Sequence, residues 1–258
     1  MSSDTTRNGR LGAIKLSLVA CAFAWGASGC AAELGDADTA DEDVEATSSS
    51  IVGGQATNAY PAVGALTRGG SSFCTGTVVA KRVVVTAAHC LEGVRASSIR
   101  FALGSSARSP QASLGVTRAV IHPQYDARAI RNDIGVLVLS QDAPVTPIAI
   151  NGSMTSSWVG RPLDFVGFGA TNGWSGAGSG TKRAVTIAVS QVGATQFAYA
   201  DRTKNTCFGD SGGPAFAKDE SGGLVLVGVT SYGDQTCTQY GVDTRVDAYK
   251  SFIAAAQQ

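Results

Sequence analysis

Charged residues are scarce in this sequence, and no stretch of it is strongly basic. Only 16% of the 258 residues are charged and 44% are hydrophobic, a balance that excludes an intrinsically disordered chain. Residues 51–258 carry 17 lysines and arginines against 12 acids, a difference of +5, and these charges are scattered. Without a basic stripe or interleaved basic and aromatic residues, we expect no binding of nucleic acid.

Long stretches with helical periodicity are also nearly absent. The 32 glycines separate short β-branched runs, which is typical of an all-β protein. The clearest runs cover residues 83–86, 134–139, 163–168, 184–190 and 224–232. Only residues 246–256 have the apolar spacing of a helix.

The amino-terminal region resembles an export signal. Three cations within residues 1–15 precede an apolar run at 16–27, which is too short to span a membrane. The run ends in small residues followed by Cys30, which resembles the lipobox of bacterial lipoproteins, where the cysteine is lipidated. Ala27 stands where leucine is usual, and a signal peptide cut near Ala32 without lipidation is the alternative.

Residues 31–50 differ in composition from both of their neighbours. They carry seven acids, no base and no apolar periodicity. We therefore expect a signal peptide over residues 1–30, an acidic linker or propeptide over 31–50, and a globular domain over 51–258. The chain has six cysteines. Cys21 would be lost with the signal peptide and Cys30 would be lipidated. The four cysteines that remain are enough for two disulfides in an exported chain.

The sequence has only two histidines, His89 and His122, and this limits its chemistry. No Cys/His spacing is typical of zinc, so we expect neither a metal nor another cofactor. Residues 209–213 read Gly-Asp-Ser-Gly-Gly, and a nucleophilic Ser211 needs a base, usually histidine. No histidine follows Ser211, which excludes a triad in the chain order Ser, acid, His. No acid lies between the start of the globular part and His89, which excludes a triad in the chain order Asp, His, Ser. The order that remains is His, Asp, Ser.

Four motifs in this order resemble the chymotrypsin/trypsin family of serine proteases. They are Ile-Val-Gly-Gly at 51–54, Thr-Ala-Ala-His-Cys at 86–90, Asn-Asp-Ile at 132–134 and Gly-Asp-Ser-Gly-Gly-Pro at 209–214. The resemblance covers the whole globular domain. It implies two antiparallel six-stranded β-barrels, about 51–148 and 149–258, a C-terminal helix, and an active site between the barrels. It also implies two disulfides, Cys74 with Cys90 and Cys207 with Cys237.

The resemblance assigns a role to each residue of the candidate active site. It implies that Ser211 attacks the peptide carbonyl, that His89 takes and later returns the proton, and that Asp133 orients His89. The backbone amides of Gly209 and Ser211 would form the oxyanion hole. Ser231 would hydrogen-bond near Asp133 and help to seat the substrate backbone.

The resemblance also implies a zymogen. In the family, a newly cut amino terminus pairs with the aspartate beside the nucleophile, and here these residues are Ile51 and Asp210. We therefore expect activation by cleavage between Ser50 and Ile51. Because Ser50 replaces the usual arginine or lysine, the activating protease is not expected to be trypsin-like.

Five residues match positions of the family's specificity pocket: Asn205, Ser231, Gly233, Gly241 and Asp243. Asn205, at the floor, carries no charge, and Gly233 and Gly241 leave room for a large side chain. These features predict a preference for large uncharged residues such as Phe, Tyr, Leu or Met. Asp243 stands where the family usually has tyrosine, and a carboxylate there would attract a basic side chain instead. Both preferences stay open at this point.

The sequence thus predicts an exported, monomeric serine endopeptidase that acts on polypeptides. It would be bacterial, either secreted or bound to the cell envelope, and would meet a membrane only through a lipid anchor on Cys30. Two alternatives remain: a binding module that keeps the fold without catalysis, and a serine esterase that uses the same site.

Overall fold

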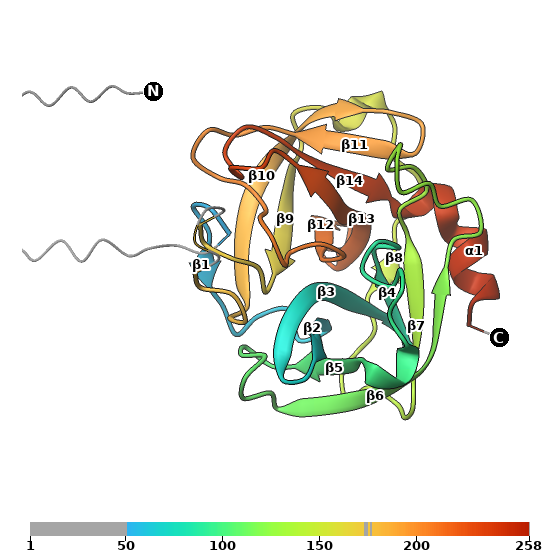
Figure 1. Ribbon diagram of the computed structural model, residues 1–258. Helices are drawn as coiled ribbons and strands as arrows, with labels where there is room; N and C mark the ends of the chain where they lie inside the picture. Colours follow the sequence, from blue (N-terminus) through green and yellow to red (C-terminus); the bar gives the residue numbers. More distant parts are fainter. Residues whose placement is uncertain (1–50, 173–174, 176, 258) are drawn as a thin grey trace, which may run out of the picture. The chain divides into compact units, whose positions relative to one another are not determined.

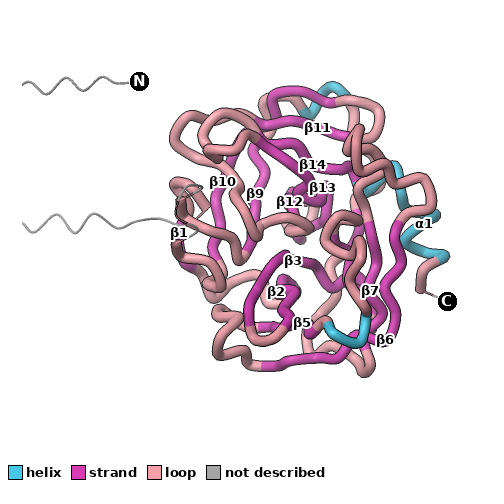
Figure 2. Tube along the Cα trace, viewed as in Figure 1, coloured by secondary structure: helices cyan, strands magenta, loops and turns pink. Residues whose placement is uncertain are grey.

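A computed structural model describes residues 51–172, 175 and 177–257, and these residues fold into two closed β-barrels (Figure 1). The predicted signal peptide and acidic linker, residues 1–50, lie outside the described residues. Strands dominate the trace, and helix is confined to short segments (Figure 2). The predicted two-barrel fold is therefore confirmed. None of the helices in the described residues is long and apolar enough to cross a membrane.

The first barrel closes from six antiparallel strands in the order β2-β3-β4-β7-β6-β5. They are β2 (Val63–Arg68), β3 (Ser71–Ala80), β4 (Val83–Thr86), β5 (Arg100–Leu103), β6 (Ala112–Ile121) and β7 (Gly135–Leu139). Strand β4 has the predicted bounds, and β7 starts one residue after the predicted run. Both are buried along nearly their whole length, and mainly apolar residues occupy both of their faces.

The second barrel closes in the order β9-β10-β11-β14-β13-β12. These strands are β9 (Pro162–Gly167), β10 (Arg183–Val192), β11 (Gln196–Tyr199), β12 (Pro214–Lys218), β13 (Leu224–Gly233) and β14 (Gly241–Arg245). Strand β1 (Gln55–Ala56) adds to β10, and β8 (Ala149–Ile150) adds in parallel to β13. The amino-terminal end of the described chain therefore joins the sheet of the second barrel before the chain enters the first.

Strand β10 shows how the sequence pattern produces the barrel wall. Val185, Ile187 and Val189 are buried, whereas the residues between them are exposed. This alternation arises because successive side chains of a strand point to opposite faces. The buried face packs on an aromatic core in which the ring centroids of Phe165 and Tyr199 lie 4.1 Å apart.

The C-terminal segment that was predicted as one helix is a 3₁₀ turn, Val246–Tyr249, followed by the helix α1 (Lys250–Ala255). Its buried side chains belong to the core of the first barrel. The Arg118 guanidinium of β6 donates to the backbone oxygen of Ala256 at 2.8 Å. The end of the chain thus crosses from the second barrel to the first and holds the two together (Figure 1).

Two disulfides form as predicted. Cys74 in β3 pairs with Cys90, and their Cα atoms are 6.2 Å apart. Cys207 pairs with Cys237, with Cα atoms 5.3 Å apart. The first disulfide ties the loop after β4 to β3, and the second joins the segment before β12 to the loop after β13.

Candidate active site

His89 and Asp133 form a hydrogen-bonded pair at the seam between the barrels. His89 lies three residues after β4, and Asp133 lies two residues before β7. Because β4 and β7 are paired, the two residues meet at one edge of the first barrel. Nδ1 of His89 lies 2.8 Å from Oδ2 of Asp133, and the His89 amide donates to Oδ1 at 2.9 Å. A carboxylate in this place fixes the ring orientation and keeps a proton on Nδ1.

Both carboxylate oxygens of Asp133 have partners although the side chain is fully buried. Ser231 Oγ, from β13, donates to Oδ2 at 2.5 Å, and Thr244 Oγ1, from β14, donates to the Asp133 backbone oxygen at 2.9 Å. Burial would raise the pKa of Asp133, but the hydrogen bonds and charge of His89 and the bond from Ser231 lower it below its ordinary value. Asp133 is therefore an anion held by both barrels.

Ser211 reaches this seam from the second barrel, in the turn that leads into β12. Its backbone oxygen accepts a hydrogen bond from the Thr75 amide of the first barrel at 2.8 Å. The next residue, Gly212, has φ 79° and donates to the Thr230 oxygen at 2.8 Å. A Cβ atom on Gly212 would lie 2.0 Å from Thr86 Oγ1, so only glycine fits. The turn that carries Ser211 is thus clamped between the barrels.

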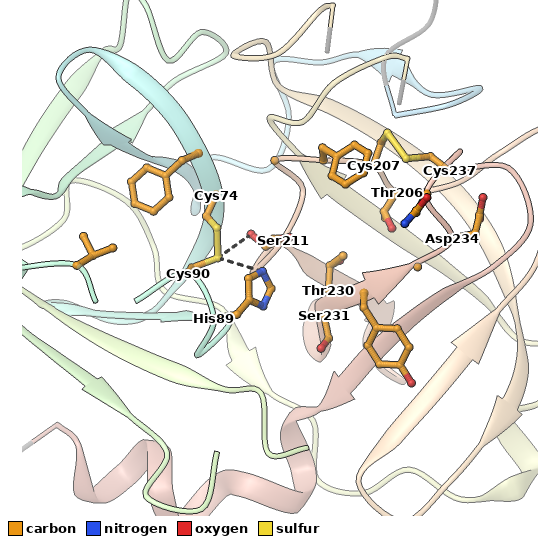
Figure 3. A pocket seen from close by; sticks show the side chains of 17 residues that line it. Cys74, His89, Cys90, Thr206, Cys207, Ser211, Thr230, Ser231, Asp234 and Cys237 are labelled. Atoms are coloured by element: carbon orange, nitrogen blue, oxygen red, sulfur yellow. Dashed lines mark hydrogen bonds between the residues drawn. A yellow bond between two sulfur atoms is a disulfide. The ribbon is translucent and has the colours of Figure 1, made fainter. Parts of the chain in front are cut away.

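His89 and Ser211 line one cavity of about 580 Å³ (Figure 3). Nε2 of His89 lies 3.7 Å from Cys90 Sγ, which itself lies 3.6 Å from the Ser211 backbone oxygen. No hydrogen bond joins Nε2 of His89 to Ser211 Oγ in the described part of the chain. Such a bond is often long in unliganded enzymes and shortens when substrate binds.

Gly209 and Ser211 contribute two free backbone N–H groups beside this cavity. Neither amide donates to another group in the part of the chain that the structure describes. The Gly209 oxygen accepts from Thr75 Oγ1 at 2.9 Å, which fixes the orientation of the peptide unit that follows Gly209. Gly209 has φ 96°, and a Cβ atom there would lie 3.0 Å from the Cα of Gly169. Both N–H groups are available to stabilise developing negative charge.

Asp210, beside the nucleophile candidate, is buried without a counter-ion. Its side chain accepts from the amides of Gly169 and Cys207, each at 2.8 Å. Burial raises the pKa of Asp210 to about 7, although these two hydrogen bonds and the charge of Arg183 oppose the shift. No ion pair with Asp210 forms among the described residues.

Ile51 is buried in the core of the second barrel and is 1% exposed. Its φ of 50° is unusual for a β-branched residue. The following residue, Val52, is held by a hydrogen bond from the Asn205 amide to its oxygen at 3.0 Å. The structure records no ion pair between Ile51 and Asp210, because Ile51 carries an amide rather than a charged amine in the uncut chain.

The residues predicted for the specificity pocket separate into two groups. Ser231 and Gly233 line the cavity. Asn205, which is 1% exposed, and Gly241, which lies against the ring of Tyr199, do not line it. A Cβ atom on Gly241 would lie 2.3 Å from that ring, so Tyr199 fills the space that the glycine leaves.

Asp243 is inside the second barrel and does not line the cavity. Its Oδ1 accepts from the Tyr199 hydroxyl at 3.1 Å, and the same hydroxyl lies 2.7 Å from Thr206 Oγ1. Its Oδ2 is buried with no hydrogen-bond partner. Burial raises the pKa of Asp243 well above its ordinary value, although the hydrogen bond from Tyr199 opposes the shift. Asp243 is thus bonded within the barrel by Tyr199 and does not face the cavity, where the sequence analysis had it attract a basic side chain.

Several residues that line the cavity were not assigned to the site from the sequence, among them Thr206, Phe208 and Asp234. Phe208 is 56% exposed, which is unusual for a large apolar side chain and reflects its place at the cavity rim. Asp234 follows Gly233 directly, in the loop that the Cys207–Cys237 disulfide closes. The sequence feature that could have identified Asp234 is an acidic residue between strand β13 and Cys237.

One group of possible metal ligands occurs in the described residues. Sγ of Cys74, Sγ of Cys90 and a ring nitrogen of His89 lie within 4.8 Å of one another. Both sulfurs are joined in a disulfide, so neither is a thiolate ligand.

Comparisons with known proteins agree with this geometry. A family model described as Trypsin matches residues 51–253. Trypsin beta of Drosophila erecta is 34% identical over 209 residues, which cover 71% of this chain and 78% of that protein. Trypsin delta of Drosophila melanogaster is 33% identical over 241 residues, covering 79% and 87%. Trypsin of Saccharopolyspora erythraea is 31% identical over 226 residues, covering 77% and 94%. The chain therefore belongs to the trypsin family of serine endopeptidases.

Proposed function

We propose that this chain hydrolyses peptide bonds through Ser211, His89 and Asp133. The observation that carries the proposal is the 2.8 Å contact between His89 Nδ1 and Asp133 Oδ2, in the same cavity as Ser211. His89 Nε2 takes the proton of Ser211 as Oγ bonds to the carbonyl carbon. It then gives that proton to the leaving amine, and water, activated in the same way, releases the acyl group.

The amides of Gly209 and Ser211 would bind the oxyanion of the tetrahedral intermediate. This role is supported by their lack of partners in the described structure and by the rigid turn that presents them. Donors held in place before the reaction stabilise the transition state more than the ground state. Loss of one such donor typically lowers kcat by about 10²- to 10³-fold.

A fluorophosphonate probe tests the nucleophile directly. We expect it to label the processed enzyme at Ser211 and to abolish peptide hydrolysis. Ser211→Ala and His89→Ala should each lower kcat by about 10⁴-fold or more. His122→Ala is the matched control, because His122 packs against Tyr249 and Phe252 away from the cavity. Absence of labelling would favour the non-catalytic binding module, and labelling with hydrolysis of esters alone would favour the esterase.

We also propose that the protein is made as a zymogen and activated by cleavage of the Ser50–Ile51 bond. The buried carboxyl of Asp210, which has no cationic partner in the described chain, supports this idea. A free amine on Ile51 would supply that cation and hold the turn that carries Gly209. Active enzyme should begin Ile-Val-Gly-Gly on amino-terminal sequencing, and full activity in a precursor that cannot be cut would refute the mechanism.

We propose further that the precursor is exported, that Cys30 carries a lipid anchor, and that the processed domain is a monomer. No cysteine lies within residues 31–50, so no disulfide would retain the propeptide, and cleavage at Ser50 would free the domain from the membrane. Radiolabelled palmitate should enter the precursor but not a Cys30→Ala variant. Cys21→Ala, within the apolar run, is the control and should be labelled normally. Equal labelling of the Cys30→Ala variant would remove the basis for the anchor.

A further inference from the structure

A second, smaller cavity lies where the two barrels are joined. Its volume is about 130 Å³, and it is lined by the segment before β2, the turn between β5 and β6, the connection that follows β7, and Lys182 at the start of β10. None of its lining residues belongs to the cavity that holds His89 and Ser211. A single water needs only about 10–15 Å³ of such space, so this cavity has room for a small ion together with water.

Lys182 is the one charged residue that lines this cavity in the described chain. Its side chain is 1% exposed. Nζ donates to the Tyr60 oxygen at 2.9 Å, lies 3.5 Å from the Ala59 oxygen, and is 5.7 Å from the centre of the Phe168 ring. An ammonium group has three donors, so these two carbonyl groups leave one donor unused.

The positive charge of Lys182 has no counter-ion among the described residues. Burial of an unpaired charge is costly, and it lowers the pKa of Lys182 from 10.5 to about 8. Carbonyl dipoles offset only part of this cost, because they carry no full negative charge. A negative ion beside Nζ would offset the rest.

The other polar side chains of the cavity are those of Asn58, Ser105 and Gln111. Each has an N–H or O–H group that can donate, and none of them makes a side-chain hydrogen bond within the described chain. No aspartate or glutamate of the described residues lines the cavity. Asn58 and Gln111 are exposed, so the cavity is open to solvent and an ion can enter it. Unused donors around one cation are the surroundings that an anion requires.

We propose that this cavity binds one small monovalent anion, inorganic or a carboxylate, which pairs with the ammonium group of Lys182. The anion would lie beside two backbone contacts between the barrels. The Lys182 amide donates to the Ser105 oxygen at 2.8 Å, and the Ala107 amide donates to the Gly180 oxygen at 2.7 Å. A bound anion would therefore stabilise the joint between the barrels, and this effect does not depend on peptidase activity.

Thermal unfolding of the Ser211→Ala precursor at pH 7 tests the site. Chloride, acetate and gluconate are compared at constant ionic strength, with gluconate as the bulky reference anion. We expect chloride or acetate to raise the Tm by about 2–6 °C over gluconate, with a rise that saturates as the site fills. The larger rise identifies an inorganic ion or a carboxylate as the preferred ligand. Equal Tm values in all three salts would overturn the proposal.

Variants in the same background assign the effect to Lys182. Lys182→Met should remove the dependence on the anion, whereas Lys218→Met, at an exposed strand end outside the cavity, should retain it. In the parent, the gain in Tm should shrink as pH rises from 7 to 10, because only the ammonium form attracts an anion. A gain that persists unchanged in Lys182→Met would overturn the assignment.

Two measurements decide the case if Lys182→Met fails to fold. Gln111→Leu changes an exposed lining residue and should weaken the anion dependence, whereas Gln191→Leu, exposed on β10 and outside the cavity, should not. Crystals of the Ser211→Ala protein soaked in bromide should show an anomalous scattering peak beside Nζ of Lys182. Bromide found only at other places on the surface would overturn the proposal.

Discussion

The Tyr199 hydroxyl donates a hydrogen bond to Oδ1 of Asp243 across 3.1 Å, inside the second barrel. Strands β11 and β14 are neighbours, and their register places Tyr199 opposite Gly241. The ring therefore covers the glycine, and its hydroxyl reaches both Asp243 and Thr206. The Asp243 carboxyl group, which the sequence predicts at the back of the specificity pocket, is therefore held in the core of the second barrel.

Removal of this hydroxyl should cost stability. In Tyr199→Phe, the Asp243 carboxyl loses its bond from Tyr199 and Thr206 loses its partner, so we expect a loss of about 1–3 kcal/mol in the free energy of unfolding. Denaturant unfolding of an inactive Ser211→Ala background measures the change without self-digestion. Tyr240→Phe is the control, because Tyr240 is 42% exposed, and it should unfold like its parent. If Tyr199→Phe unfolds at the same denaturant concentration as its parent, the hydrogen bonds of the Tyr199 hydroxyl do not stabilise the fold as described.

Ser231 should support catalysis through Asp133. Ser231→Ala removes a hydrogen bond to the Asp133 carboxylate and so raises the pKa of Asp133 toward its ordinary value. A hydrogen bond to a charged group contributes about 1.5–3 kcal/mol, so we expect kcat/KM to fall by about 10- to 100-fold. Ser221→Ala, which removes a similar 2.7 Å bond to Asp219 outside the cavity, is the control and should keep full activity. A pH–rate profile of Ser231→Ala identical to the wild type would argue against this role.

The order of the motifs made the fold and the site predictable from the sequence. Strand β4 and the residues Thr86 to Cys90 form one uninterrupted local pattern, so the place of His89 after a buried strand could be read directly. The same holds for Asp133 before β7 and for Ser211 in its glycine-rich turn. Each of these positions depends on a short segment whose residues are neighbours in the chain.

The environment of the pocket could not be predicted, because it depends on contacts between distant strands. The partner of Asp243 lies 44 residues away in Tyr199, and only the pairing of β11 with β14 brings them together. Asp234 depends on how its own loop folds back, since five amide or hydroxyl donors of residues 236–240 converge on it. A sequence pattern shows that these residues are present, but not which way their side chains turn.

Asp210 should make the stability of the precursor depend on pH. Its pKa is raised to about 7 in the folded chain and is near its ordinary value of 3.8 in the unfolded chain. Between these values the folded state binds more protons, so the free energy of unfolding should fall as pH rises from about 4 to 7. Unfolding of the Ser211→Ala precursor in guanidinium chloride at each pH measures this slope.

The comparison that isolates this effect is Asp210→Asn in the same precursor. It should lose most of the slope, whereas Asp142→Asn, at an exposed position, should keep it. A slope that is unchanged in Asp210→Asn would show that the buried carboxyl does not titrate as the structure indicates.

Lys182 should make the stability of the fold depend on pH in the direction opposite to Asp210, and at alkaline pH. The side chain is 1% exposed, and its Nζ donates to the Tyr60 oxygen at 2.9 Å without a carboxylate partner in the described chain. Burial lowers the pKa of Lys182 from 10.5 to about 8. Between pH 8 and 10.5 the unfolded chain binds more protons, so the free energy of unfolding should rise with pH, by at most about 1.4 kcal/mol for each unit of pKa difference.

Lys182→Met should lack this rise, and Lys218→Met, at an exposed strand end, should retain it. A Lys182→Met variant whose unfolding midpoint rises with pH as steeply as the wild type would show that the buried ammonium is not the group responsible.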